Sequence, residues 1–434
     1  MSVSATVATL TPTARSFNRV HLWLSMVLLA IGFASVAWTR LNIAIILPEV
    51  MQGIGVTSLA VGGFLATLSV LGNGLAEPFM GHLSDRIGRR LALTIGLAGF
   101  SILSLITALA TNLPEMIAIR ILLGVLQGLY IPTYLAFVGG TFEKRRGFWI
   151  EGLVGMFTIG SAINPIATRA IFDASGGAWQ APSLIYGIFG VVVAAGVFAL
   201  GSGGIYDRAR TRQAAEAASA NTTATPAFEP LRSQFDRSML LIIVALVCWG
   251  FTQYAYLGLF VTYLRQAQGF SLETATGAAS LAGWVTFAAA FFVGWTSDQI
   301  GRRKTLMIAG GVAAILAYPL FAWTTSFWIA VGIGAVFGAC NGAFFGLGVA
   351  YAQDLARGRN LGGRSGMITG AGHFTSGFGG GVAALVASTF GYQAIGIELA
   401  VLCACMVVCM YLTVDRAHLA RMAERQHTIA EMPA

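Results

Sequence analysis

The sequence predicts an all-α membrane protein, with twelve transmembrane helices in two pseudo-symmetric six-helix bundles. Three observations support this: an apolar composition, twelve apolar stretches of membrane-spanning length, and one loop pattern that occurs twice. Of the 434 residues, 56% are hydrophobic and only 10% are charged, whereas a soluble domain carries about 25% charged residues. Such a chain cannot cover itself with a hydrated surface, which excludes a soluble enzyme, a disordered protein and a nucleic-acid-binding protein.

A helix needs about 20 apolar residues to cross a membrane. Twelve stretches satisfy this requirement, at 20–46, 58–82, 91–111, 114–141, 148–172, 181–204, 238–265, 273–297, 304–325, 327–353, 363–390 and 392–414. The first stretch is too long for a cleaved signal peptide and lacks a convincing cleavage site. We therefore expect it to be the first transmembrane helix.

The basic residues predict that both termini lie in the cytoplasm. If they do, all but four of the 26 Lys and Arg residues fall in cytoplasmic segments, as the positive-inside rule requires. The net charge of +8 thus reflects orientation rather than a nucleic-acid partner. Lysine occurs twice against 24 arginines, which is typical of GC-rich bacterial coding, so we expect the bacterial cytoplasmic (inner) membrane.

The polar stretch 205–237 predicts a flexible cytoplasmic linker between the two halves. The predicted organisation is an N-terminal tail at 1–19, a bundle at 20–204, the linker, a second bundle at 238–414 and a C-terminal tail at 415–434. We expect a monomer in the lipid bilayer.

A loop pattern is repeated at matching places in the two halves. Residues 81–90 read GHLSDRIGRR after the second span, and residues 294–303 read GWTSDQIGRR after the eighth. A doubled loop in a twelve-helix chain indicates an internal duplication. Both copies resemble the signature loop of the major facilitator superfamily, roughly G-x-L-x-D-R-x-G-R-R/K, and the second departs from it at Gln299, where Arg or Lys is usual. The resemblance covers essentially the whole chain.

The resemblance implies a gate on the cytoplasmic side. The loop aspartate, here Asp85, would meet the N-terminal end of the eleventh span, where an acid gains about 0.3–1 kcal/mol from the helix dipole. Arg89 would meet acids at neighbouring helix ends, such as Glu143. The expected gating residues are Gly81, Asp85, Arg86, Gly88, Arg89, Arg90, Glu143, Asp298 and Arg302. The alternative is that the arginines only anchor the topology.

Two arginines lie inside expected spans, where ionisable residues are costly and indicate function. Arg40 is in the outer half of the first span. Arg120 shares one helical stripe of the fourth span with Gln127 and Tyr134. If both arginines face one cavity, they require an anion, and a carboxylate accepts a guanidinium bidentately. The alternative is that they snorkel or pair with backbone carbonyls.

The arginine positions resemble those of the anion:cation symporter and sialin-like branches. In those branches the first-span arginine faces the substrate, and a glutamate seven residues after the fourth-span arginine carries protons. Here Gln127 stands in place of that glutamate, and Thr39 stands where an aspartate is common. The proton route of those branches is therefore missing.

Other polar residues inside spans extend the candidate site. Gln253 and Tyr256 lie on a stripe of the seventh span that also carries aromatics, whose alternative role is helix packing. Asn164, Asn341 and His373 are further substrate-binding candidates. If transport is proton-coupled, His373 and Glu77 are the candidate carriers, although a lone histidine is more often a packing residue.

The sequence lacks an ATP-binding loop, a catalytic nucleophile motif and a metal-binding spacing, so we expect no enzyme activity, cofactor or metal. It predicts secondary active transport by alternating access. The leading substrate is a small organic anion, a carboxylate, moved by proton symport or exchange. The alternative is proton-driven efflux of drug-like amphipathic compounds. A degraded efflux motif at 160–169 weakens that alternative, and a likeness of 351–366 to fosmidomycin-resistance-like exporters keeps it open.

Overall fold

The structure, a computed structural model, describes residues 19–57, 59–201, 205–207, 236–355 and 361–413. The predicted tails and most of the predicted linker lie outside these residues, so their boundaries stay predictions. The first half contains α1 (Arg19–Ile45), α2 (Leu47–Gly53), α3 (Leu59–Ile87), α4 (Arg89–Thr107), α5 (Leu113–Thr141), η1 (Glu143–Arg145), α6 (Arg146–Ala174), α7 (Gln180–Leu200) and η3 (Ile205–Asp207). The second half contains α9 (Arg237–Gln266), α10 (Leu272–Ile300), α11 (Arg302–Ala322), α12 (Phe327–Leu355), α13 (Leu361–Phe390) and α14 (Tyr392–Leu412).

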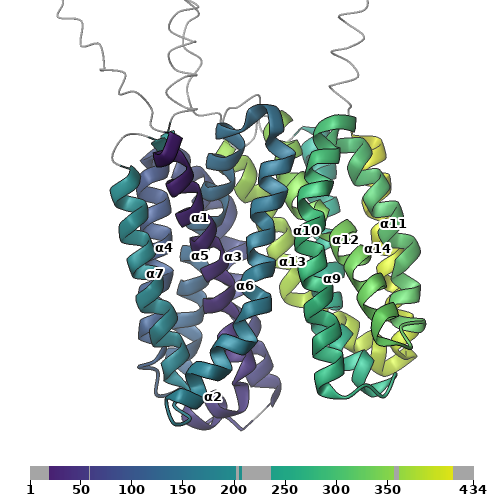
Figure 1. Cartoon of the computed structure of the whole chain (residues 1–434), viewed down its shortest axis with the longest axis horizontal. Coiled ribbons are helices and arrows are strands. Elements are labelled where there is room, and N and C mark those ends of the chain that lie inside the picture. Colours follow the sequence, from purple (N-terminus) through teal and green to yellow (C-terminus); the bar gives the residue numbers. More distant parts are fainter. Residues whose placement is uncertain (1–18, 58, 202–204, 208–235, 356–360, 414–434) are drawn as a thin grey trace, which may run out of the picture.

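The predicted fold class is confirmed. Twelve long helices of the described chain coincide with the twelve predicted spans, and they form two bundles that stand side by side (Figure 1). Within the described residues, nine helices are long and apolar enough to cross a membrane, or ten if the bent pair in α6 counts as one span. The two remaining long helices, α3 and α13, pack against each other between the halves, where an all-apolar surface is not required.

Glycine starts the helix that follows each copy of the repeated loop. Gly88 has φ 89° and precedes α4, and Gly301 has φ 94° and precedes α11. This left-handed conformation is accessible to glycine at little cost and is strained for other residues. The pattern therefore needs glycine at this position to turn the chain between two antiparallel helices.

We call the end of the bundles at which Arg89, Arg146 and Arg302 begin their helices the basic end; it is uppermost in Figure 1. The halves meet chiefly through two helix pairs, α3 with α13 and α6 with α10, and α5 with α13 and α6 with α12 add smaller contacts. Their close approaches extend from the middle of the helices toward the basic end. At Gly81, for example, an added Cβ would overlap the Gly362 carbonyl oxygen.

A glycine of α13 provides a test of this close packing. A side chain at Gly366 would overlap the backbone of Glu77, so we expect Gly366→Val to prevent α13 from closing on α3. Overpacking of this kind typically costs about 1–3 kcal/mol. In a background without native cysteines, a thiol reagent should label Ser84→Cys, which is fully buried near Gly362, faster in the variant.

Gly381→Val is the matched control, because a Cβ at Gly381 of the same helix meets no atom within 4 Å. Equal labelling of the two glycine variants would contradict the close-packed seam.

Candidate functional site

A cavity lies between the two halves and is lined by residues of α1, α5, α6, α9, α12 and α13. Its volume is ≈ 90 Å³, well below the roughly 300–1,000 Å³ of a typical ligand pocket. Its walls are chiefly aromatic and aliphatic, and the lining side chains with polar atoms are Arg40, Thr158, Trp249, Gln253, Tyr254 and His373. A molecule bound here would touch both halves at once.

Arg40 brings an unpaired positive charge to this cavity. The side chain is 1% exposed, and its Nε and Nη2 donate to Gln127 Oε1 at 3.3 and 3.0 Å. Nη1 has no hydrogen-bond partner. In the part of the chain that the structure describes, no carboxylate pairs with Arg40. The guanidinium lies 5.6 Å from the centre of the Phe157 ring, so an aromatic wall adjoins the charge.

Trp249 also lines this cavity and has a second unpaired donor. It is 5% exposed, and its indole Nε1 has no partner. Its ring packs 4.9 Å from the ring of Phe345, which also lines the cavity. Leaving a buried donor unsatisfied costs about 1–3 kcal/mol. Two such donors around one cavity therefore favour a ligand that carries hydrogen-bond acceptors.

Arg120 lies elsewhere, in the packed interior of the first half. Its Nη1 donates to the Thr39 carbonyl at 2.9 Å, and its Nη2 donates to the Arg40 carbonyl at 2.8 Å and to Ser69 Oγ at 3.0 Å. This is the backbone-carbonyl arrangement that the sequence left open as the alternative. Arg120 thus joins α5 to α1 and α3, and it does not line the cavity.

The remaining substrate-binding candidates divide in the same way. Gln253 lines the cavity and accepts a hydrogen bond of 2.8 Å from Asn341 Nδ2. Tyr134 stacks on an α1 phenylalanine, Asn164 donates to an α1 carbonyl at 3.3 Å, and Tyr256 donates to an α12 carbonyl at 3.1 Å. These three side chains connect helices within one half.

The two proton-coupling candidates meet across the boundary between the halves. His373 Nδ1 on α13 lies 2.9 Å from Glu77 Oε2 on α3. Glu77 is 0% exposed, and His373 is 7% exposed and lines the cavity. Two acceptor atoms without a proton would repel at this distance, so one proton must lie between them. The pair is therefore a buried hydrogen bond that both halves share.

A second buried carboxyl at the boundary was not predicted from the sequence. Glu151 of α6 is 4% exposed and faces Gly346 of α12, where a Cβ would overlap its carboxylate. Its Oε2 has no partner. Its position inside the expected span 148–172 was the available sequence signal, because acids are rare inside spans.

The acids of the repeated loops bind helix N-termini across the boundary. Asp85 accepts from the backbone N–H groups of Gly362 (3.2 Å) and Gly363 (2.8 Å) at the start of α13. Asp298 accepts from the N–H groups of Gly147 and Phe148, both at 3.0 Å, at the start of α6. Each half thus caps a helix of the other half at the basic end.

Ion pairs join the halves at the same end. Asp354 of the second half pairs with Arg146 of the first half, and it also pairs with Arg302, which pairs in turn with Asp298. Arg90 has a different role, since it donates to the Phe198 carbonyl and anchors α4 to α7.

The other expected gating residues are also near the basic end. Arg86 is exposed, Arg89 is buried and Glu143 lies in η1.

Two six-helix bundles share a cavity and pack closely against each other at one end, which is a two-halved membrane fold. The chain belongs to the Major Facilitator Superfamily, whose family model matches residues 22–287 and 269–428. The protein is accordingly a multi-pass membrane transporter and not an enzyme.

Curated relatives match only part of this chain. A triacylglyceride transporter of Mycobacteroides abscessus is 38% identical over 103 residues, which cover 24% of this chain and 20% of the relative. The multidrug resistance protein MdtG of Serratia proteamaculans is 30% identical over 135 residues, which cover 30% of this chain and 33% of the relative.

Solved structures match along nearly the whole chain. The human organic anion transporter MFSD10 superposes with a TM-score of 0.68 at 16% identity, covering 89% of this chain and 99% of that one. The proton:xylose symporter XylE superposes with a TM-score of 0.69 at 15% identity, covering 91% and 96%. At these identities the likeness concerns the fold alone.

Proposed function

We propose that this protein is a secondary active transporter for a small amphipathic organic anion, a carboxylate, working by alternating access. The observation that carries this proposal is the pair of unpaired donors, Arg40 Nη1 and Trp249 Nε1, at one cavity where no carboxylate of the described residues pairs with the arginine. A carboxylate would accept from both donors and neutralise the buried charge. The apolar body of the ligand would lie against Phe33, Phe157 and Phe345.

The conformational cycle follows from where the halves touch. In our proposal the basic end is cytoplasmic, and the contacts of Asp85, Asp298 and Asp354 keep that side closed. Breaking them and closing the opposite ends of the bundles would expose the cavity to the cytoplasm. We place the protein in the bacterial cytoplasmic membrane, acting as a monomer.

Proton coupling in this proposal occurs at the pair of His373 and Glu77. The proton between them can come from a neutral imidazole while Glu77 is ionised, and the pair then carries one negative charge. A second proton makes the pair neutral and removes its negative charge from beside the cavity that His373 lines. An anion in the cavity would favour that second proton, and by thermodynamic reciprocity the proton would favour the anion. One proton would then move with each anion.

Efflux of amphipathic compounds remains the second candidate. It is favoured by the aromatic walls of the cavity and by partial matches to proteins named multidrug resistance protein and triacylglyceride transporter. The two candidates differ in the ligand charge that the site prefers. An organic anion would pair with Arg40, whereas an uncharged or cationic drug would not.

The charge preference can be measured on the purified protein by thermal unfolding. We expect an arylalkanoic acid to stabilise the protein, by about 2.7 kcal/mol at a concentration 100 times its Kd. The primary amide and the amine of the same shape should stabilise it much less, because neither neutralises Arg40. Equal or greater stabilisation by the amine or the amide would reject the anion site in favour of the efflux candidate.

A further inference from the structure

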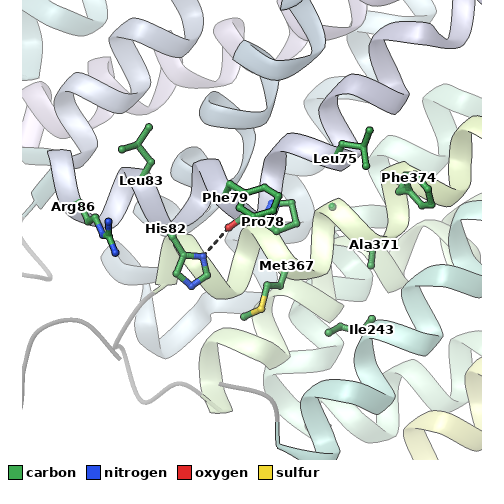
Figure 2. A pocket seen from close by; sticks show the side chains of 12 residues that line it. Leu75, Pro78, Phe79, His82, Leu83, Arg86, Ile243, Met367, Ala371 and Phe374 are labelled. Carbon is green, nitrogen blue, oxygen red and sulfur yellow. Dashed lines mark hydrogen bonds between the residues drawn. The ribbon is translucent and has the colours of Figure 1, made fainter. Parts of the chain in front are cut away.

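A second and larger cavity lies outside the central one, along the membrane-facing side of the α3–α13 seam. It has a volume of ≈ 820 Å³ and shares no lining residue with the central cavity. Figure 2 shows its side chains projecting from α3 and α13, with Ile243 of α9 on the far side. Both halves of the protein thus form the walls of one lateral groove.

Most of the groove is apolar and open to the membrane. Leu75 and Phe79 of α3 are 59% and 72% exposed, and Phe374 of α13 is 40% exposed. Exposed apolar side chains of a transmembrane helix contact hydrocarbon, so this part of the groove suits an acyl chain.

One end of the groove carries the positive charge of Arg86, beside His82, whose Nδ1 lies 2.7 Å from the Pro78 carbonyl oxygen. His82 and Arg86 follow Phe79 on the same face of α3, one and two turns closer to the basic end (Figure 2). From Leu75 to Arg86 the helix rises about 16 Å, close to half of the roughly 30 Å hydrocarbon core of a bilayer. The groove therefore has the depth of one leaflet, with its positive charge at headgroup level.

The internal duplication shows that the fold does not need this charge. In the second copy of the loop pattern, on α10, Phe292 occupies the position of Phe79, Trp295 that of His82 and Gln299 that of Arg86. The exposed aromatic is kept, since Phe292 is 66% exposed, but the basic side chains are not. The positive charge in the groove thus belongs to the α3 copy of the pattern alone.

We propose that this groove binds one anionic phospholipid, with its phosphate near Arg86 and His82 and an acyl chain along Leu75, Phe79 and Phe374. Because α3 and α13 belong to different halves, the lipid contacts both and favours the arrangement in which the basic end is closed. This site is independent of the anion proposed for the central cavity.

Native mass spectrometry of the full chain tests the site with phosphatidylglycerol and phosphatidylcholine of identical acyl chains. We expect wild type to retain phosphatidylglycerol preferentially. Arg86→Gln should lower that preference about fivefold, the usual contribution of one arginine near an anionic membrane surface. Phe79→Ala should weaken retention of both lipids, because it removes acyl-chain contact and not charge.

Two variants serve as matched controls. Phe292→Ala removes the equivalent exposed aromatic from α10, and Lys304→Gln removes an exposed charge at the basic end of α11. Both should behave as wild type. The proposal is overturned if wild type shows no preference for phosphatidylglycerol, if Arg86→Gln keeps the full preference, or if either control reproduces its matched groove variant.

Discussion

Arg40→Ala is expected to abolish binding of the organic anion while the protein still folds. Truncating one member of a buried, hydrogen-bonded charge pair costs about 2–5 kcal/mol, so affinity should fall at least ~30-fold. Arg40→Lys should also impair binding, because an ammonium lacks the planar fork that holds both Gln127 and a carboxylate. The measurement is the anion Kd of purified variants, from ligand-dependent shifts of the unfolding temperature.

Variants of two other arginines are controls that distinguish a loss of anion binding from a loss of protein stability. Arg169 is exposed and pairs with Asp173 at 2.8 Å, so Arg169→Ala should leave the anion Kd unchanged. Arg120→Ala removes three hydrogen bonds within the first half, and we expect it to lower the unfolding temperature without ligand. If Arg40→Ala binds the anion as tightly as wild type, the proposed site is wrong.

Glu77→Gln and His373→Gln are expected to uncouple transport from the proton gradient. Glutamine preserves hydrogen bonding but cannot titrate, so the pair loses its second proton. In proteoliposomes that hold wild type, one pH unit should drive accumulation of up to about tenfold for one proton per anion. Both variants should lose this accumulation and keep exchange of labelled for unlabelled anion.

Glu398→Gln is the control for this experiment. Glu398 is a membrane carboxyl of α14 that lies away from the boundary between the halves, and its removal should leave coupling intact. Accumulation that survives both Glu77→Gln and His373→Gln would exclude the pair as the proton site. Glu151 would then be the next buried carboxyl at that boundary to replace.

The helices could be predicted from sequence because hydropathy is a local property. The predicted spans 58–82 and 363–390 largely coincide with α3 and α13. Their ends were less accurate, since α3 continues to Ile87 and α13 begins at Leu361. The last turn of α3 and the first turn of α13 are held by contacts between the halves, such as those of Asp85. Hydropathy does not register such contacts.

The orientation of polar side chains was harder to predict. The spacing of Arg120, Gln127 and Tyr134 correctly indicates one helix face, but these three side chains contact α1 and α3 and do not line the cavity. Periodicity gives the shared face of a helix and leaves its rotation in the bundle open. For the same reason, the contact between Glu77 and His373, which are far apart in sequence, emerged only from the packing of the two halves.

The direction of accumulation under an imposed pH gradient tests the central claim most directly. The substrate should be a permanently charged organic anion, such as an arylalkyl sulfonate or a strong carboxylic acid, compared with protein-free liposomes. Proton symport predicts saturable accumulation in the alkaline compartment, and reversal of the gradient should reverse it. The account would be contradicted if movement of the anion did not saturate or did not respond to the gradient. It would also be contradicted if amines accumulated in the acidic compartment and anions did not accumulate in the alkaline one.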